Sequence, residues 1–201
     1  MVLCPSFPFL RRHFLVRLAV LAGVVLGGAA ATRAAEPPQV GGVAPDFSLA
    51  AIDGAPVRLA ELTTRGPVVL IVLRGWPGYQ CPLCDRQVNE FVAARAAFAS
   101  APAQVVFVYP GPAADLRAHA AEFQSIKGRE WPAAFRFALD PDFTMVNAYA
   151  LRWAARGETA YPSTFVLDRG GVVRFAKISR THGDRAKAAD ILAALEALRA
   201  P

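Results

Sequence analysis

The sequence predicts an α/β protein in which strands and helices alternate and the chain closes with a β-hairpin and a helix. Val68–Leu73 is an apolar run with the length of a buried strand, too short for a helix. Thr164–Asp168 and Val172–Phe175 flank the turn Arg169–Gly171 as the two strands of a hairpin do. The last segment has apolar side chains at helical spacing, namely Ile191, Leu192, Leu195 and Leu198.

The segment before the apolar run is expected to form an N-terminal β-hairpin. Pro45–Leu49 and Val57–Leu59 have the composition of short strands, and the Asp53–Gly54 pair between them is a turn signal. Arg65–Pro67 then interrupts the chain, because Gly and Pro favour turns over regular structure. This hairpin extends a sheet whose centre is the apolar run.

The segment after the apolar run alternates between helices and a strand. A first helix is indicated by apolar residues near one face, at Val88, Phe91, Val92 and Phe98. Ala101–Pro102 breaks the chain before the strand Gln104–Tyr109. Pro112 opens a second helix, whose apolar face carries Leu116, Ala120 and Phe123. Asp140–Pro141 caps a further short helix that ends near Tyr149.

Residues 1–35 have the features of an export signal. Three arginines, at positions 11, 12 and 17, precede the apolar run Leu18–Ala31. Ala29–Ala31 offers a cleavage site, and a cut nearer Ala34 or Ala35 is the alternative. Arg11–Leu15 resembles the twin-arginine export pattern, with an ordinary secretory signal or an uncleaved membrane anchor as alternatives. We expect a periplasmic or otherwise extracytoplasmic protein that contacts the membrane only through this segment.

The rest of the chain has the length of one domain. Residues 36–44 are interpreted as a linker and residues 45–201 as a single domain, with no internal repeat and no second span of membrane length. The net charge falls from +6 to +3 when residues 1–31, with their three arginines, are removed. This small excess of positive charge does not indicate a nucleic-acid partner.

Two cysteines, Cys81 and Cys84, lie where the apolar strand gives way to a helix. Pro82 suits the first helical position, so Cys81 is the expected N-cap and Cys84 falls in the first turn. Unpaired backbone N–H groups and the helix dipole stabilise a thiolate there and lower its pKa. The spacing also allows a reversible disulfide between the two sulfurs, so the pattern predicts a redox site.

A zinc site and plain packing of two buried cysteines are the alternative interpretations. Zinc needs two more ligands, and the three histidines, His13, His119 and His182, are scattered. Cys4 belongs to the predicted export signal, so the processed chain keeps only the pair. We therefore expect no metal and no cofactor.

Four stretches together resemble a known family: Gly42–Phe47, the cysteine segment, Asp140–Pro141 and Tyr161–Asp168. They are similar to the alkyl hydroperoxide reductase/thiol-specific antioxidant (AhpC/TSA, peroxiredoxin-like) redoxins of the thioredoxin-fold superfamily. The resemblance covers residues 40–200. It implies a thioredoxin-like fold, with a central mixed sheet flanked by helices.

Within this resemblance, peroxide reduction is the leading function. Pro77, Cys81 and Cys84 have the spacing of the peroxiredoxin pattern P-x-x-x-T-x-x-C, with Cys81 in place of the threonine. The resemblance implies that Cys84 attacks the peroxide and Cys81 resolves the sulfenic acid as a disulfide. Pro162 stands where peroxiredoxins carry an arginine, and Arg74 is the candidate for supplying the missing positive charge.

Thiol–disulfide exchange on proteins is the alternative function. The resembling oxidoreductases share C-x-x-C and a cis proline beside the cysteine loop, which Pro162 matches. Here Cys81 is the exposed nucleophile, Cys84 resolves, and Tyr79 is a substrate-binding candidate by its proximity to Cys81. Either function implies a thiol electron donor such as a thioredoxin-like protein. A copper chaperone is a third alternative, which usually has C-x-x-x-C and a later histidine that is absent here.

Overall fold

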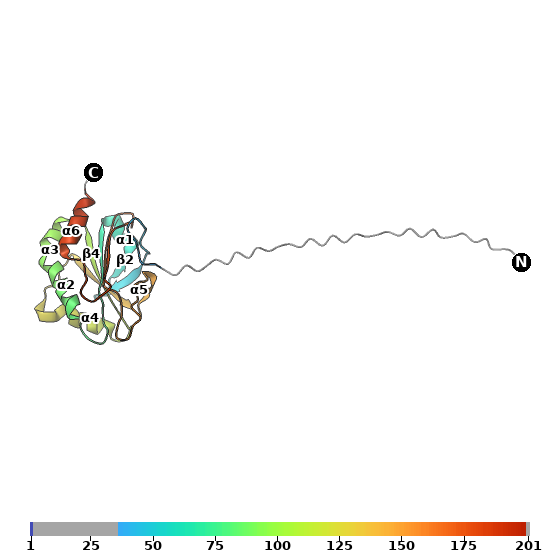
Figure 1. The fold of residues 1–201 in the computed structure, drawn as a ribbon, viewed down its shortest axis with the longest axis horizontal. Coiled ribbons are helices and arrows are strands. Elements are labelled where there is room, and N and C mark those ends of the chain that lie inside the picture. Colours follow the sequence, from blue (N-terminus) through green and yellow to red (C-terminus); the bar gives the residue numbers. More distant parts are fainter. Residues whose placement is uncertain (2–35, 200–201) are drawn as a thin grey trace. The chain divides into compact units, whose positions relative to one another are not determined.

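The computed structural model describes residues 1 and 36–199, which excludes the predicted export signal. The described domain is a seven-stranded mixed sheet with the strand order β2-β1-β5-β4-β3-β6-β7, flanked by helices on both faces (Figure 1). The strands are β1 (Ser48–Ala51), β2 (Pro56–Arg58), β3 (Val68–Val72), β4 (Gln104–Gly111), β5 (Phe135–Pro141), β6 (Ser163–Leu167) and β7 (Val173–Ile178). The helices are α1 (Leu59–Arg65), α2 (Pro82–Ala93), α3 (Arg95–Ser100), α4 (Leu116–Ser125), the 3-10 turn η1 (Ile126–Gly128), α5 (Thr144–Ala148) and α6 (Ala188–Ala197).

The central strand β3 is buried along its whole length. It runs parallel to β4 on one side and antiparallel to β6 on the other. Because successive side chains of a strand point to opposite faces, Val69 and Ile71 face one apolar cluster and Val68, Leu70 and Val72 the other. Helices α2, α3, α4 and α6 contribute to the first cluster, and α1 and α5 to the second (Figure 1).

These observations confirm the predicted α/β class and the N-terminal hairpin, in which β1 pairs antiparallel with β2. Residues 41–44 lie against the β6–β7 turn. Gly41 N–H donates to Val173 O at 2.8 Å, and Ala44 N–H donates to Gly171 O at 3.0 Å.

The sequence patterns did not predict α1, β5 or the 3-10 turn η1, and the single helix that they predicted through Phe98 is divided into α2 and α3. The β5 strand pairs parallel with β4 and antiparallel with β1, so it joins the hairpin to the rest of the sheet. At its end, the Asp140 carboxylate accepts the N–H groups of Met145 and Val146 at 2.8 and 3.0 Å. Asp140 therefore caps the short helix α5 as predicted.

None of the helices in the described part has the length and apolar character needed to cross a membrane. Apart from residue 1, the predicted export signal lies outside the described residues, and so does its cleavage site.

Candidate active site

The two cysteines begin helix α2, as predicted. Cys81 is the N-cap residue and Pro82 the first helical residue. The chain reaches this point from β3 through a tight turn at Gly75, whose φ is +73°. A Cβ there would lie 1.9 Å from Pro110 O, so only glycine fits where the loop crosses the end of β4.

The loop between Gly75 and Cys81 is anchored to its neighbours. The Trp76 ring stacks on His119 of α4 with 3.6 Å between ring centroids. Gln80 donates to His119 O at 2.9 Å and accepts the Tyr109 hydroxyl at 2.9 Å. These contacts fix the direction from which the chain enters α2, and therefore the position of the Cys81 sulfur.

Both thiols are reduced and buried, with Cys81 3% exposed and Cys84 fully enclosed. The Cys84 thiol donates to the Cys81 sulfur, which lowers the pKa of Cys81 to about 5. Burial opposes this shift, while the amides of Leu83 and Cys84 and the charge of Arg185 support it. Burial and the same hydrogen bond raise the pKa of Cys84. At neutral pH, Cys81 is therefore the thiolate and Cys84 the thiol.

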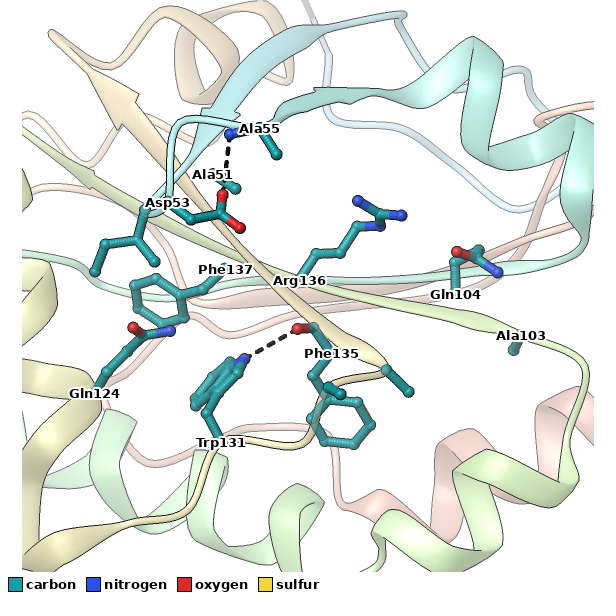
Figure 2. A pocket seen from close by; sticks show the side chains of 13 residues that line it. Ala51, Asp53, Ala55, Ala103, Gln104, Gln124, Trp131, Phe135, Arg136 and Phe137 are labelled. Atoms are coloured by element: carbon teal, nitrogen blue, oxygen red, sulfur yellow. Dashed lines mark hydrogen bonds between the residues drawn. The ribbon is translucent and has the colours of Figure 1, made fainter.

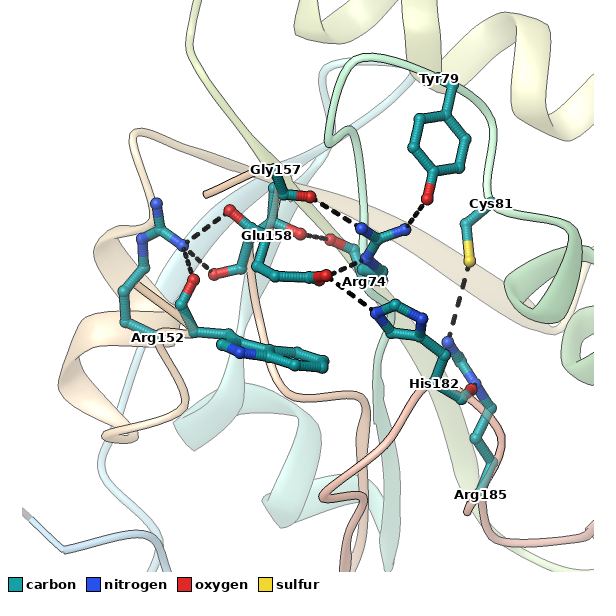
Figure 3. Close-up of polar contacts among 10 residues, drawn as sticks. Arg74, Tyr79, Cys81, Arg152, Gly157, Glu158, His182 and Arg185 are labelled. Atoms are coloured by element: carbon teal, nitrogen blue, oxygen red, sulfur yellow. Dashed lines mark hydrogen bonds and ion pairs between the residues drawn. The ribbon is translucent and has the colours of Figure 1, made fainter. Parts of the chain in front are cut away.

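The cation beside the thiolate is Arg185, from the loop between β7 and α6. Its Nη2 atom lies 3.9 Å from Cys81 Sγ (Figure 3). Its Nη1 donates to Gln87 Oε1 at 2.9 Å and its Nε donates to His182 O at 2.8 Å. The sequence patterns did not identify Arg185 as part of the site; Gln87 and the His182 carbonyl hold its guanidinium toward the sulfur.

Arg74, the predicted source of positive charge, is enclosed in a polar network instead. It is 3% exposed. Its Nε pairs with Glu158 Oε2 at 2.7 Å, and its Nη2 donates to Gly157 O at 2.7 Å (Figure 3). Its Nη1 donates to the hydroxyl of Tyr79, whose residue is half exposed. The Arg74 charge is thus neutralised by Glu158, and its backbone amide contacts the Cys84 sulfur.

Glu158 also joins this network to the loop that carries Arg185. Its Oε1 lies 3.0 Å from His182 Nε2, and the Thr159 hydroxyl donates to Arg74 O. Three loops that are distant in sequence are therefore connected beside the cysteines. Sequence reasoning missed both Glu158 and the role of His182, because no local pattern marks either.

The expectation of a cis bond before Pro162 is wrong, since no peptide bond within residues 36–199 is cis. Tyr161 N–H donates to Leu151 O at 2.9 Å, and Pro162 O accepts from Ser179 N–H at 2.8 Å. These two hydrogen bonds hold the chain on both sides of Pro162 where it enters β6.

Of two cavities in the described domain, one is lined by the cysteine loop and the other is not. Pro77, with Trp76 and Gly78, lines an open cavity of about 350 Å³ whose other wall includes Gly157 and Glu158. A cavity of about 390 Å³ lies against the start of β5 and contains Arg136 (Figure 2). No residue of the cysteine loop lines this second cavity, so it is not part of the thiol site.

A metal site is not formed by the cysteine pair in the described part of the chain. Within residues 36–199, no three His, Cys, Asp or Glu side chains lie close enough together to hold a metal ion. His119 stacks on Trp76, and His182 pairs with Glu158.

Replacing Arg185 with Gln is expected to raise the pKa of Cys81 by roughly one unit, because a cation within about 4 Å favours the thiolate. The pH dependence of Cys81 alkylation by iodoacetamide measures this pKa. The alkylation rate of the wild type should rise through pH 5–6 and level off by neutral pH, whereas that of the variant should level off at a higher pH. Arg169→Gln, in the exposed β6–β7 turn, is the control. An unchanged midpoint in Arg185→Gln would show that the helix terminus and Cys84 alone hold the thiolate.

Reversible oxidation of a neighbouring thiolate and thiol is the chemistry of thiol-dependent oxidoreductases, and the fold and the site place this chain in that class. The family follows from the sequence. The profile of the AhpC/TSA family matches residues 40–176, so the chain belongs to that family.

Solved structures with similar folds include members of two functional groups. Peroxidoxin BcpB from Mycobacterium tuberculosis is 26% identical with a TM-score of 0.64, and the match covers 81% of this chain and 99% of that one. A candidate thiol:disulfide interchange protein DsbE from Chlorobium tepidum is 27% identical with a TM-score of 0.57, over 79% of this chain and 99% of that one.

The reduced 2-Cys peroxiredoxin from Plasmodium vivax has a TM-score of 0.65 over 81% of this chain and 83% of that one. At 16% identity it supports the fold alone. These similarities confirm the predicted thioredoxin-like fold. Among curated protein sequences, none matches this chain.

Proposed function

We propose that the protein reduces small hydroperoxides, with Cys81 as the attacking thiolate and Cys84 as the resolving thiol. The observation that carries this proposal is a Cys81 thiolate only 3% exposed, with the Arg185 guanidinium 3.9 Å from its sulfur. A hydroperoxide is small enough to reach a sulfur that is almost buried, whereas a protein disulfide must bring a whole chain against it. These roles are the reverse of those that the peroxiredoxin spacing implies.

The chemistry follows from the two protonation states. The Cys81 thiolate attacks one oxygen of the hydroperoxide, and the O–O bond breaks. The departing oxygen takes the hydroperoxide proton and leaves as an alcohol or water, while Cys81 becomes a sulfenate, which takes up a proton from solvent to give the sulfenic acid. Cys84, in hydrogen-bond contact with Cys81, then attacks that sulfur; water leaves and the disulfide forms. Two electrons pass from the cysteine pair to the peroxide, and a thiol donor must return them.

The test is to mix the reduced protein with one equivalent of hydrogen peroxide. We expect loss of one peroxide and two thiols per chain, and a disulfide between Cys81 and Cys84 in the peptide map. The reaction should be far faster than that of free cysteine, because Cys81 is already ionised at neutral pH. Protein with both thiols alkylated is the control. If the protein thiols are lost no faster than the thiol of free cysteine, peroxide is excluded as the substrate.

Thiol–disulfide exchange is the second candidate function. A low-pKa sulfur followed by a high-pKa sulfur also suits a nucleophile and a resolving group in disulfide exchange. The similarity to the candidate DsbE supports this function as well. The two functions are separated by comparing two rates for the same reduced protein: reduction of insulin disulfides and consumption of peroxide. Fast insulin reduction with slow peroxide consumption would favour disulfide exchange.

We also propose that the protein works outside the cytoplasm. The support comes from residues 1–35 alone, with their basic start, apolar run and Ala29–Ala31 cleavage pattern. Cell fractionation of the wild type and of an Arg11→Lys/Arg12→Lys variant tests both export and the twin-arginine route.

A further inference from the structure

A basic pocket lies next to the cysteine site, between α2 and the loop that precedes α6. It has a volume of about 220 Å³ and is lined on the helix side by Leu83, Arg86 and Glu90. Arg185 and Lys187 line the loop side. Arg185 is the link to the active site, because the same side chain that borders the pocket reaches the Cys81 sulfur.

The residues that line the pocket carry a net positive charge. The exposed side chains of Arg86 and Lys187 form no ion pair with any residue of the described part. Apart from the Cys81 sulfur, Arg185 contacts uncharged oxygens of Gln87 and His182. In the oxidised protein the Cys81 sulfur carries no charge. Glu90 is the acidic residue in the lining, and its Oε1 accepts the Ala188 N–H at 2.7 Å. Three cations against one carboxylate favour an anionic ligand.

We propose that this pocket binds the carboxylates of a low-molecular-weight thiol that reduces the Cys81–Cys84 disulfide. The inference rests on the reversible oxidation of the cysteine pair proposed above. Every turnover leaves a disulfide, so a reductant must reach Cys81. A pocket of 220 Å³ accommodates the acidic end of a small molecule, while Arg185 favours the ionised form of the incoming thiol.

The reduction balances with two molecules of the thiol. The first, as a thiolate, attacks Cys81 Sγ; the Cys81–Cys84 bond breaks and Cys84 leaves and takes up a proton, as its raised pKa favours. The second attacks the sulfur of the bound reductant in the mixed disulfide and releases the Cys81 thiolate. Two thiols are oxidised to one disulfide, and the cysteine pair receives two electrons.

The test starts from protein oxidised with diamide, so that no peroxide reaction is needed. Reduction by glutathione, which carries two carboxylates, is compared with reduction by 2-mercaptoethanol, which carries none. We expect saturable kinetics with glutathione. Arg86→Ala/Lys187→Ala should lower kcat/KM for glutathione about tenfold, the size expected when two partly exposed charge contacts are lost. The rate with 2-mercaptoethanol should stay unchanged, and Arg169→Ala should affect neither thiol.

S-methylglutathione, which has the same carboxylates and no free thiol, tests the pocket directly. It should inhibit reduction by glutathione and leave reduction by 2-mercaptoethanol unaffected. Unsaturable glutathione kinetics, an equal loss with both thiols in the double variant, or reduction by a thioredoxin-like protein but not by glutathione would each overturn the inference. Because the disulfide is formed chemically, these outcomes are independent of whether the protein consumes peroxide.

Discussion

Cys81→Ser is expected to lower the rate of peroxide consumption by roughly 10³-fold or more, since a serine hydroxyl stays protonated where the thiolate stood. Cys84 does not replace it, because Cys84 is fully enclosed and burial raises the pKa of its thiol. Stopped-flow measurement of peroxide loss compares Cys81→Ser with the wild type at equal concentrations of reduced protein.

The matched variant, Cys84→Ser, should behave differently. Its hydroxyl still donates a hydrogen bond to the Cys81 sulfur, so the thiolate remains and one peroxide per chain is consumed. Without a resolving thiol, the sulfenic acid should persist on Cys81 and be trapped by dimedone. A dimedone adduct on Cys84 in the Cys81→Ser protein, with none on Cys81 in the Cys84→Ser protein, would assign the attack to Cys84.

Glu158→Ala is expected to lower the free energy of unfolding by about 3–5 kcal/mol, because it leaves the buried Arg74 guanidinium without its counter-ion. The side chains of Arg74 and Glu158 are only 4% and 12% exposed, so water does not replace the lost partner. Urea unfolding at neutral pH measures the change.

The exposed pair Arg58–Glu61 supplies the control for this prediction. Its side chains are 52% and 51% exposed, so Glu61→Ala should change the free energy of unfolding by no more than about 1 kcal/mol. Combining Glu158→Ala with Arg74→Met should recover much of the loss, because the uncompensated buried charge is removed. Equal effects of Glu158→Ala and Glu61→Ala would mean that the Arg74 pair adds no stability.

The local part of the site was predictable from sequence. Pro82 fixes the start of α2, and the apolar run before it marks β3, so the placement of both cysteines followed from neighbouring residues alone. The hairpin β6–β7 and helix α6 were predictable for the same reason, since their side-chain periodicity is local.

The groups around the sulfurs were not predictable in this way. Arg185 and Glu158 lie on irregular loops, and each reaches the cysteine region from about 80 to 100 residues further along the chain. Nothing in the neighbourhood of either residue distinguishes it from an exposed charge. Strand β5 was missed although Phe135, Phe137 and Leu139 alternate, because the run is short and follows a loop that begins with Trp131–Pro132.

The contact between Arg185 and Cys81 has a consequence for the direction of electron flow. A thiolate stabilised by a cation, the helix terminus and a neighbouring thiol favours the dithiol state over the disulfide. Each tenfold gain of the dithiol state makes the reduction potential about 30 mV less negative. We therefore expect a disulfide between Cys81 and Cys84 to accept electrons readily, and the pair to be mostly reduced when a donor thiol is present.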